Sequence, residues 1–222
     1  MDGIVSYVKY YKYPRTFHLP FSLGLINDDR RIENLNAFIG QRVIVTEKMD
    51  GESTSLYPDH LHARSLDSKH HPSRNWIKKF HGIIRSNIPD GYRLCGENLF
   101  AIHSIFYDTL PSYFLLFSIW DGDKCLSWEQ TVEYAELLNI RLVPVLYDGI
   151  WDEDKIKACW TGVSKYGPEQ EGSVVRLASS FMFDDFEKSV TKFVRKGHVQ
   201  TSEHWLNQIV IPNRLNVETL PI

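Results

Sequence analysis

Alternating hydrophobic and polar positions divide much of the chain into short β-strands. The clearest case is residues 42–48 (RVIVTEK), where β-branched residues alternate with polar ones and a turn-forming Asp50-Gly51 pair follows. Similar runs recur and are separated by residues typical of turns. They predict further strands at residues 53–57, 60–64, 92–98, 113–120, 173–178 and 191–195.

Four segments have the periodicity or the capping residues of helices. Residues 28–39 carry apolar side chains at helical spacing. Ser73 is suited to cap a second helix. Residues 127–138 open with capping-box spacing, and a fourth helix is predicted from Asp152 to near Gly162.

The order of these elements indicates the fold class. Strands that occur in runs with a few interposed helices predict an α+β fold built on antiparallel sheets. No internal repeat, low-complexity linker or break in composition divides the chain. Residues 1–222 are therefore expected to form a single domain.

The composition favours an ordinary globular protein over a membrane-spanning or disulfide-linked one. The chain is 43% hydrophobic and 24% charged, with a formal net charge of -3. It lacks an apolar run of about 18 residues, and its polar N-terminus lacks a signal-peptide core. The three cysteines are odd in number and far apart. We therefore expect no membrane association and a location in the cytoplasm or another reducing intracellular compartment.

Two basic segments stand out against this slightly acidic composition. Residues 64–85 contain six Lys and Arg with one acidic residue, and residues 188–198 contain four with none. Such segments suit a protein that binds a few phosphates of nucleic acid, although a solvated helix face is the commoner meaning of a charge run. The candidates for nucleic-acid contact are Arg64, Arg74, Lys78, Arg195 and Lys196.

Lys48 is the first candidate for chemistry. It ends a predicted strand and precedes the tight Asp50-Gly51 turn, so its amine is expected to project into whatever cleft the sheet borders. An amine there can attack phosphorus if nearby cations lower its pKa or if metal ions neutralise the phosphates. Taken alone, this short pattern more often marks a hairpin with an exposed lysine.

Four further motifs follow Lys48 in a fixed order. They are Cys95-Gly96-Glu97-Asn98, the apolar strand at residues 114–119, Glu171-Gly172-Ser173-Val174-Val175-Arg176 and Lys192-Phe193-Val194-Arg195-Lys196. With these motifs the chain resembles the covalent nucleotidyltransferases, which comprise ATP-dependent DNA and RNA ligases and mRNA capping enzymes. The resemblance spans roughly residues 43–196 and implies a nucleotidyltransferase (ATP-grasp-like) domain of antiparallel sheets with flanking helices.

The resemblance implies a role for each motif in the transfer of AMP from ATP. Lys48 would attack the α-phosphate, release pyrophosphate and form a lysyl-AMP. Glu97 would accept hydrogen bonds from the ribose, and Phe117 would stack on the purine. Glu171 would help to bind Mg²⁺ (or Mn²⁺) near the α-phosphate, and Lys192 would neutralise charge on the transferring phosphate.

Three more positions are implied by the same resemblance. Glu47 and Ser53 are expected to contact the nucleotide, and Arg64 to touch the AMP phosphate or the nucleic-acid end. Each role has a plainer alternative. The two motif glutamates can be solvated or ion-paired acids, and Phe117 can be an ordinary core residue.

The departures from the family pattern favour RNA as the substrate. DNA ligases and capping enzymes commonly have arginine where this chain has Ser53, whereas RNA ligases often have a smaller polar residue. Only 26 residues follow Lys196, too few for the C-terminal OB-fold of those enzymes. Residues 198–205, with Trp205 able to stack on a base, and the His18-Leu19-Pro20 start resemble segments of small RNA ligase-like proteins.

The favoured hypothesis is an ATP-dependent RNA ligase that joins 5′-phosphate and 3′-hydroxyl ends, with a nicked duplex as one candidate substrate. It would adenylylate Lys48, pass AMP to the 5′-phosphate and release AMP as the 3′-hydroxyl attacks. The alternatives are a DNA ligase or a capping-type guanylyltransferase of the same superfamily, and a nucleic-acid-binding module that has lost catalysis. The motifs identify no protein partner.

Overall fold

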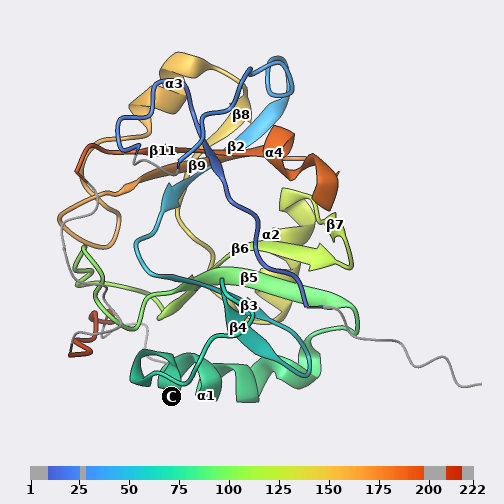
Figure 1. Cartoon of the computed structure of the whole chain (residues 1–222), viewed down its shortest axis with the longest axis vertical. Helices are drawn as coiled ribbons and strands as arrows, with labels where there is room; N and C mark the ends of the chain where they lie inside the picture. The colour runs from blue at the N-terminus through green and yellow to red at the C-terminus, as the bar shows by residue number, and fades with distance from the viewer. Residues whose placement is uncertain (1–9, 26–28, 198–208, 217–222) are drawn as a thin grey trace, which may run out of the picture.

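The computed structural model describes residues 10–25, 29–197 and 209–216, which form two β-sheets that face each other with helices on their outer sides (Figure 1). The segment at residues 198–205 and the start of the helix predicted from residue 28 lie outside the described residues. Within them, no helix is long and apolar enough to cross a membrane.

The first sheet has five strands in the order β1-β11-β9-β2-β8. Its neighbours are antiparallel except β1 and β11, which are parallel. The strands are β1 (Phe17–His18), β2 (Arg42–Lys48), β8 (Val145–Ile150), β9 (Gly172–Leu177) and β11 (Val190–Val194). The prediction for β2 is confirmed to the residue, and β9 and β11 lie within one residue of their predicted bounds.

The second sheet has six antiparallel strands in the order β10-β7-β6-β5-β3-β4. Four of them are the predicted strands, shifted by at most one residue, and β7 and β10 were not predicted. The strands are β3 (Glu52–Leu56), β4 (Leu61–Ala63), β5 (Tyr92–Asn98), β6 (Phe114–Asp121), β7 (Lys124–Cys125) and β10 (Phe181–Met182).

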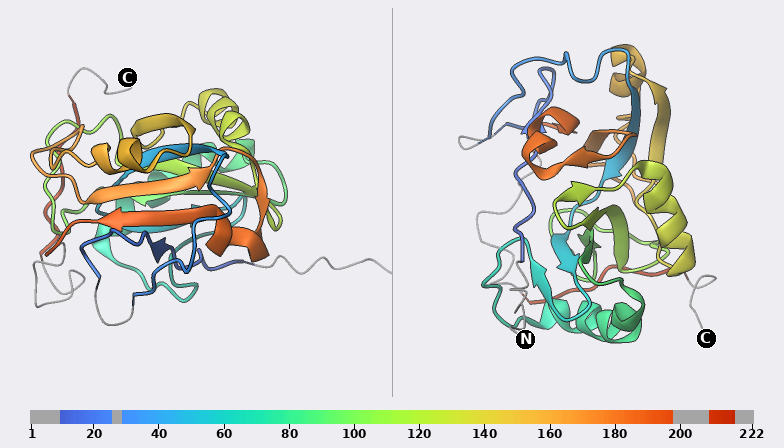
Figure 2. Two further views of the ribbon diagram at one scale, coloured as in Figure 1. Left: turned by 90° about the horizontal axis from the view of Figure 1, so that it is seen from above. Right: turned by 90° about the vertical axis from the view of Figure 1, so that its right-hand side faces the viewer.

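Strand alternation places one face of each sheet on a hydrophobic core and the other toward the opposite sheet. In β2, Val43 and Val45 are fully buried with Ile156 of α3 (Glu153–Ala158) on the outer side. In the second sheet, Leu56 and Leu94 pack against α1 (Asn75–Ile84) and α2 (Trp128–Leu137), which cover its outer face (Figure 2). The inner faces are thereby left free to carry polar side chains.

The helix caps agree with the predictions at two places and differ at a third. Ser127 and Gln130 form the predicted capping box of α2, and Asp152 accepts the hydrogen bond of an N-cap for α3. Ser73 is not the cap of α1, because it lies inside a 3-10 turn (Pro72–Arg74) whose own cap is His71.

The helix predicted for residues 28–39 is wrong. The Ile32 N–H donates to His18 O in an extended arrangement, and only a short turn remains at residues 36–40. The side chain of Asn34 accepts from the N–H of Asn36, a local bond that competes with helix formation. Ile32 and Leu35 still pack in the core, whereas Ile39 is exposed, so the apolar spacing reflects docking of an irregular segment.

An N-terminal strap, defined here as residues 10–16, connects the two sheets. It runs from β1 of the first sheet down to the second sheet (Figure 1). There the Tyr11 N–H donates to Tyr57 Oη at 2.9 Å, and Arg93 donates to Tyr11 O at 2.8 Å. The strap therefore closes one side of the space between the sheets.

Candidate active site

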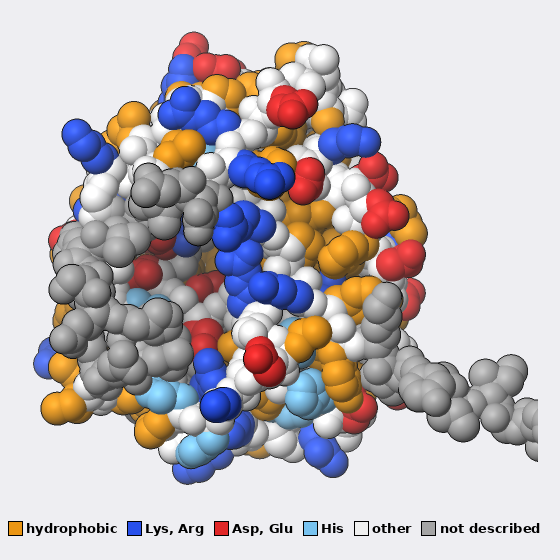
Figure 3. All heavy atoms as spheres, viewed as in Figure 1, with side chains coloured by type: hydrophobic (Ala, Val, Ile, Leu, Met, Phe, Trp, Pro, Cys, Tyr) orange, Lys and Arg blue, Asp and Glu red, His pale blue; other side chains and the backbone are white. Residues whose placement is uncertain are grey.

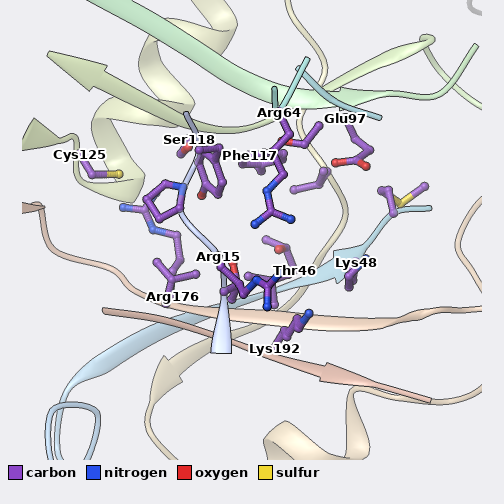
Figure 4. A pocket seen from close by; sticks show the side chains of 18 of the residues that line it. Arg15, Thr46, Lys48, Arg64, Glu97, Phe117, Ser118, Cys125, Arg176 and Lys192 are labelled. Carbon is purple, nitrogen blue, oxygen red and sulfur yellow. The ribbon is translucent and has the colours of Figure 1, made fainter. Parts of the chain in front are cut away.

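A cavity of about 400 Å³ lies between the inner faces of the two sheets. We call it the first cavity. Side chains from both sheets and from the N-terminal strap point into it (Figure 4). The charged, polar and aromatic residues that give it its chemistry are Tyr13, Arg15, Asp29, Glu47, Lys48, Ser53, Arg64, Glu97, Phe117, Ser118, Arg176 and Lys192.

Lys48 reaches the first cavity from the last position of β2. Its turn is held by Asp50, whose Oδ2 accepts the N–H groups of Ser104 at 2.7 Å and Ile105 at 2.8 Å. The Asp50 N–H donates to Tyr107 Oη at 2.9 Å. The motif that the sequence predicted to be a tight turn is therefore fixed on both sides of Asp50.

Lys48 forms an ion pair with Glu171, with 2.6 Å between Nζ and Oε2. Burial alone would lower the pKa of Lys48, but Glu171, Glu97 and Asp50 outweigh it, so the pKa is raised. Burial raises the pKa of Glu171, and Lys48 opposes that shift. In this state the amine is a charged ammonium and must lose a proton before it can attack an electrophile.

Gly172 explains how Glu171 comes so close to the lysine strands. Gly172 pairs with Lys48 of β2 on one side and Val194 of β11 on the other. A Cβ at this position would lie 2.0 Å from Phe193 O. Only glycine permits this approach of β9 and β11, which places Glu171 beside the end of β2.

Glu97 lies on the opposite sheet, on β5, where it pairs with Ser53 of β3. Burial raises the pKa of Glu97 to about 8, with Lys48 opposing and Glu171 and Asp50 reinforcing the shift. Both predicted glutamates and Lys48 are thus brought together across the first cavity. Glu47 is not part of this group, because its buried carboxylate accepts the Lys165 N–H at 3.1 Å.

Lys192 enters the first cavity from β11. Its Nζ lies 3.6 Å from Asp29 Oδ1, and the other carboxylate oxygen of Asp29 lies 3.2 Å from Nε2 of the buried His18. Burial lowers the pKa of Lys192, and Lys48 lowers it further, while Asp29 and Glu171 oppose the shift. Two lysines from neighbouring parts of one sheet therefore share the cavity, each beside a carboxylate.

Phe117 lines the first cavity because β6 contains a β-bulge. The register passes from Ser118 opposite Cys95 to Leu116 opposite Gly96, which leaves Phe117 as the extra residue. Both Phe117 and Ser118 consequently face the cavity (Figure 4). The ring of Tyr13 meets Phe117 edge-on, with 5.2 Å between centroids.

Arg15 and Arg64 form the basic side of the cavity, and their guanidinium groups converge with Lys192 (Figure 4). Burial lowers the pKa of Arg64, and the nearby Arg15 lowers it further. Lys and Arg side chains gather in a strip on the face of the protein that Figure 3 shows. Arg64 was predicted. Arg15 was not, because no recognisable motif lies in the strap that carries it.

The inner end of the cavity holds Arg176, which was also missed as a site residue. Arg176 is buried and donates to Leu126 O at 2.7 Å, with its guanidinium near the rings of Trp128 and Phe181. Arg176 belongs to a motif of the sequence, and its side chain faces the cavity because Val174 and Arg176 alternate along β9 with Val175, which packs in the core on the other face.

A second cavity adjoins the first and shares Ser53, Arg64 and Glu97 with it. It is more open, with a volume of about 830 Å³, and its remaining wall carries Lys69, His70, His71 and His103. The two cavities therefore meet at these three residues and form one hollow.

The predicted nucleic-acid residues divide between this hollow and other roles. Arg74 is not a free surface cation, because it is buried and pairs with both carboxylate oxygens of Glu52. Lys78 lies on the exposed face of α1 with its Nζ 3.0 Å from His70 Nδ1. Arg195 pairs with Glu169 at 2.8 Å, and Lys196 is exposed.

The donor set around Lys48 fits a divalent cation that is bound chiefly through phosphates. Among the described residues, no group of three or more His, Cys, Asp or Glu side chains could enclose a metal ion. Mg²⁺ commonly needs only one or two carboxylates in addition to phosphates and water. Glu171 supplies such a carboxylate beside the cationic cluster.

Comparison with known proteins identifies the fold and the family. The arrangement of two facing sheets with few helices is similar to the fold of an RNA ligase. The model of the RNA ligase family matches residues 41–194, well over half of the chain. The chain belongs to the RNA ligase family.

The similar solved structures include several of an RNA ligase from Naegleria gruberi. The structure with pyrophosphate is 24% identical with a TM-score of 0.53, over 76% of this chain and 55% of that one. A variant with AMP and manganese is 22% identical with a TM-score of 0.52, over 74% and 52%. A variant with ATP and manganese is 21% identical with a TM-score of 0.53, over 84% and 62%.

The chain thus spans between about half and three fifths of the length of these structures. At this level of identity the likeness shows the fold. Comparison with curated proteins gave no match.

Proposed function

We propose that this protein is an ATP-dependent RNA ligase that uses a lysyl-AMP at Lys48. The observation that carries the proposal is the position of Lys48, which is paired with Glu171 and lines a cavity together with Glu97 and a converging group of cations. The family supports RNA as the substrate. The Naegleria ligase, solved with ATP or AMP and manganese, supports ATP and a divalent cation as cofactors.

The first step is the transfer of AMP to the enzyme. The Lys48 amine forms a bond to the α-phosphorus of ATP, and the bond from phosphorus to pyrophosphate breaks. Glu171, 2.6 Å from Nζ, is placed to take the proton that the amine loses. Lys192, Arg15 and Arg64 neutralise charge on the phosphates. Glu171 would also help to hold a divalent cation, which would supply further neutralisation of the phosphates.

The nucleoside would occupy the inner part of the first cavity. Phe117, at the β-bulge, offers an aromatic surface on which the base would stack. Glu97 of β5 and Ser53 of β3 lie side by side in the same cavity and would bind the ribose hydroxyls. Glu47 also lines this cavity, with one oxygen of its carboxylate accepting the Lys165 N–H.

The RNA ends would occupy the second cavity. In the second step a 5′-phosphate oxygen attacks the lysyl-AMP phosphorus and frees Lys48. In the third a 3′-hydroxyl attacks the 5′-phosphate and AMP leaves. Lys69 and the histidines of the second cavity can bind the strand phosphates, and Arg64 lies where the two cavities meet. We also propose that residues 1–222 act as one nucleotidyltransferase domain.

The test is protein labelling with [α-³²P]ATP and Mg²⁺. The wild-type chain should acquire a covalent AMP, and Lys48→Ala should acquire none. Lys79→Ala is the matched control, since Lys79 is exposed on α1 and lines neither cavity. An unlabelled wild type, or equal labelling of Lys48→Ala, would overturn the proposal. Sealing assays on nicked RNA, nicked DNA and single strands then assign the substrate.

A further inference from the structure

The C-terminal segment at residues 209–216 lies against the loop at residues 99–113. Its backbone bonds include Ile102 N–H to Ile211 O at 2.8 Å and Leu110 N–H to Arg214 O at 3.0 Å. The Arg214 N–H in turn donates to Tyr107 O at 2.9 Å. The segment follows residue 194, where the match to the RNA ligase family ends.

Asn213 joins this segment to the loop through its side chain, and the residue is 2% exposed. Its Oδ1 accepts the Tyr107 N–H at 2.7 Å, and its Nδ2 donates to Leu99 O at 2.8 Å and Ala101 O at 3.4 Å. Both polar atoms of the amide are therefore engaged, the oxygen as acceptor and the nitrogen as a donor twice. Asn213 thus fixes the loop at three backbone positions.

The same loop fixes Asp50. The Tyr107 N–H donates to Asn213 Oδ1, and the Tyr107 hydroxyl oxygen accepts the Asp50 N–H. Ser104 and Ile105 bind the Asp50 carboxylate. A continuous chain of contacts thus runs from Asn213 through Tyr107 to a residue two positions from Lys48.

We propose that Asn213 is a positioning residue for Lys48, acting through Tyr107 and Asp50. This inference rests on the proposed function. Loss of the amide leaves the Tyr107 N–H and two carbonyls buried without their partner, a costly state that the loop relieves by shifting. The Asp50 turn moves with it, and displacement of a nucleophile by about 1 Å can slow a reaction by roughly 100-fold.

The kinetic experiment compares Asn213→Ala with Tyr113→Phe in formation of the covalent AMP. Tyr113 Oη donates to Asn213 O at 3.0 Å, so its removal disturbs the same segment without touching the chain of contacts to Asp50. Asn213→Ala should lower kcat by about 10- to 100-fold and change KM for ATP less than about 3-fold. Tyr113→Phe should keep the wild-type kcat.

A double-mutant cycle with Tyr107→Phe identifies the route. Because both residues act on Asp50 along one chain of contacts, the double variant should be no slower than about the slower single variant. Multiplied effects would show that Asn213 acts independently of Tyr107, and a wild-type kcat in a folded Asn213→Ala would overturn the inference. If Asn213→Ala does not fold, Asn213→Ser, whose side chain lacks the amide that joins Tyr107 to Leu99 and Ala101, takes its place with the same expected slowing and the same overturning result.

Hydrogen exchange provides a readout that does not depend on activity. The Ser104 and Ile105 amides, which Asp50 binds, should exchange faster than wild type in Asn213→Ala and at the wild-type rate in Tyr113→Phe. Unchanged protection in Asn213→Ala would overturn the inference. If the wild-type chain forms no covalent AMP, the proposed function fails, but the exchange result still decides whether Asn213 positions the Asp50 turn.

Discussion

The two cavities share a wall but are built differently. In the first, Lys48, Glu97 and Lys192 lie on strands, and each has an opposite charge nearby. In the second, half of the lining residues come from the loop at residues 64–71, and most of these loop residues are exposed. Sheets hold side chains more rigidly than loops. The difference suggests that one cavity performs nucleotidyl transfer and the other binds the strand.

Replacement of Lys192 by alanine should have the largest effect of the variants that test whether the first cavity performs nucleotidyl transfer. We expect covalent AMP formation to slow by about 100- to 1,000-fold, because a largely buried cation beside the transferring phosphate is lost. Single-turnover labelling measures the rate. Lys188→Ala is the control, since Lys188 is 74% exposed and lies on the neighbouring α4 (Phe186–Ser189). Equal rates for both variants would contradict a role of Lys192 in transfer.

Replacement of Lys69 by glutamate tests the other cavity. Sealing of RNA should fall by about 10-fold and become less sensitive to salt, because a phosphate contact is replaced by repulsion. Covalent AMP formation should keep its wild-type rate, as Lys69 does not line the first cavity. Lys79→Glu makes the same charge change outside both cavities. If Lys69→Glu loses RNA sealing and covalent AMP formation to the same extent, the two cavities do not have separate functions.

Glu97→Gln should show how much the burial of this ionisable side chain lowers the stability of the folded protein. The folded protein keeps Glu97 protonated up to its pKa of about 8, whereas the unfolded chain ionises it near pH 4.5. The contribution of Glu97 to stability is therefore most favourable below that lower value and is lost as the pH rises toward 8. Glutamine avoids the loss.

Thermal melting at pH 5 and pH 8 measures this effect. Relative to wild type, Glu97→Gln should gain melting temperature at pH 8, by roughly 2–4 °C for each kcal/mol recovered, and gain little at pH 5. Nucleotide binding should weaken at the same time. Glu133→Gln on the exposed side of α2 is the control. If the difference in melting temperature between wild type and Glu97→Gln does not change with pH, burial does not raise the pKa of Glu97 as assigned.

Much of the fold and the strand-borne part of the site could be predicted from the sequence. The alternation in residues 42–48 identified β2 to the residue, since a strand with one buried face repeats every two positions. Lys48, Glu97, Glu171 and Lys192 came from ordered motifs; Lys48, Glu97 and Lys192 line one cavity, and Glu171 pairs with Lys48. Their roles in catalysis remain predictions.

The rest depended on contacts between distant segments. Residues 28–39 have helical spacing, but the backbone N–H of Ile32 bonds to His18, which local sequence does not reveal. Arg15 and Asp29 become site residues only because their irregular segments pack beside β11. Arg74 was predicted to belong to a basic surface, and its buried partner Glu52 lies 22 positions away.

The parallel pairing of β1 with β11 bears on when the site is completed during synthesis. Phe17 and Thr191, which bond across this pair, are 174 residues apart, so the contact forms only after nearly all described residues have been translated. Lys48 leaves the ribosome well before Lys192, which lies on β11. A nascent chain therefore carries the first of these two lysines for the whole time needed to synthesise the intervening residues, and the two lysines come together only once β11 has emerged and paired.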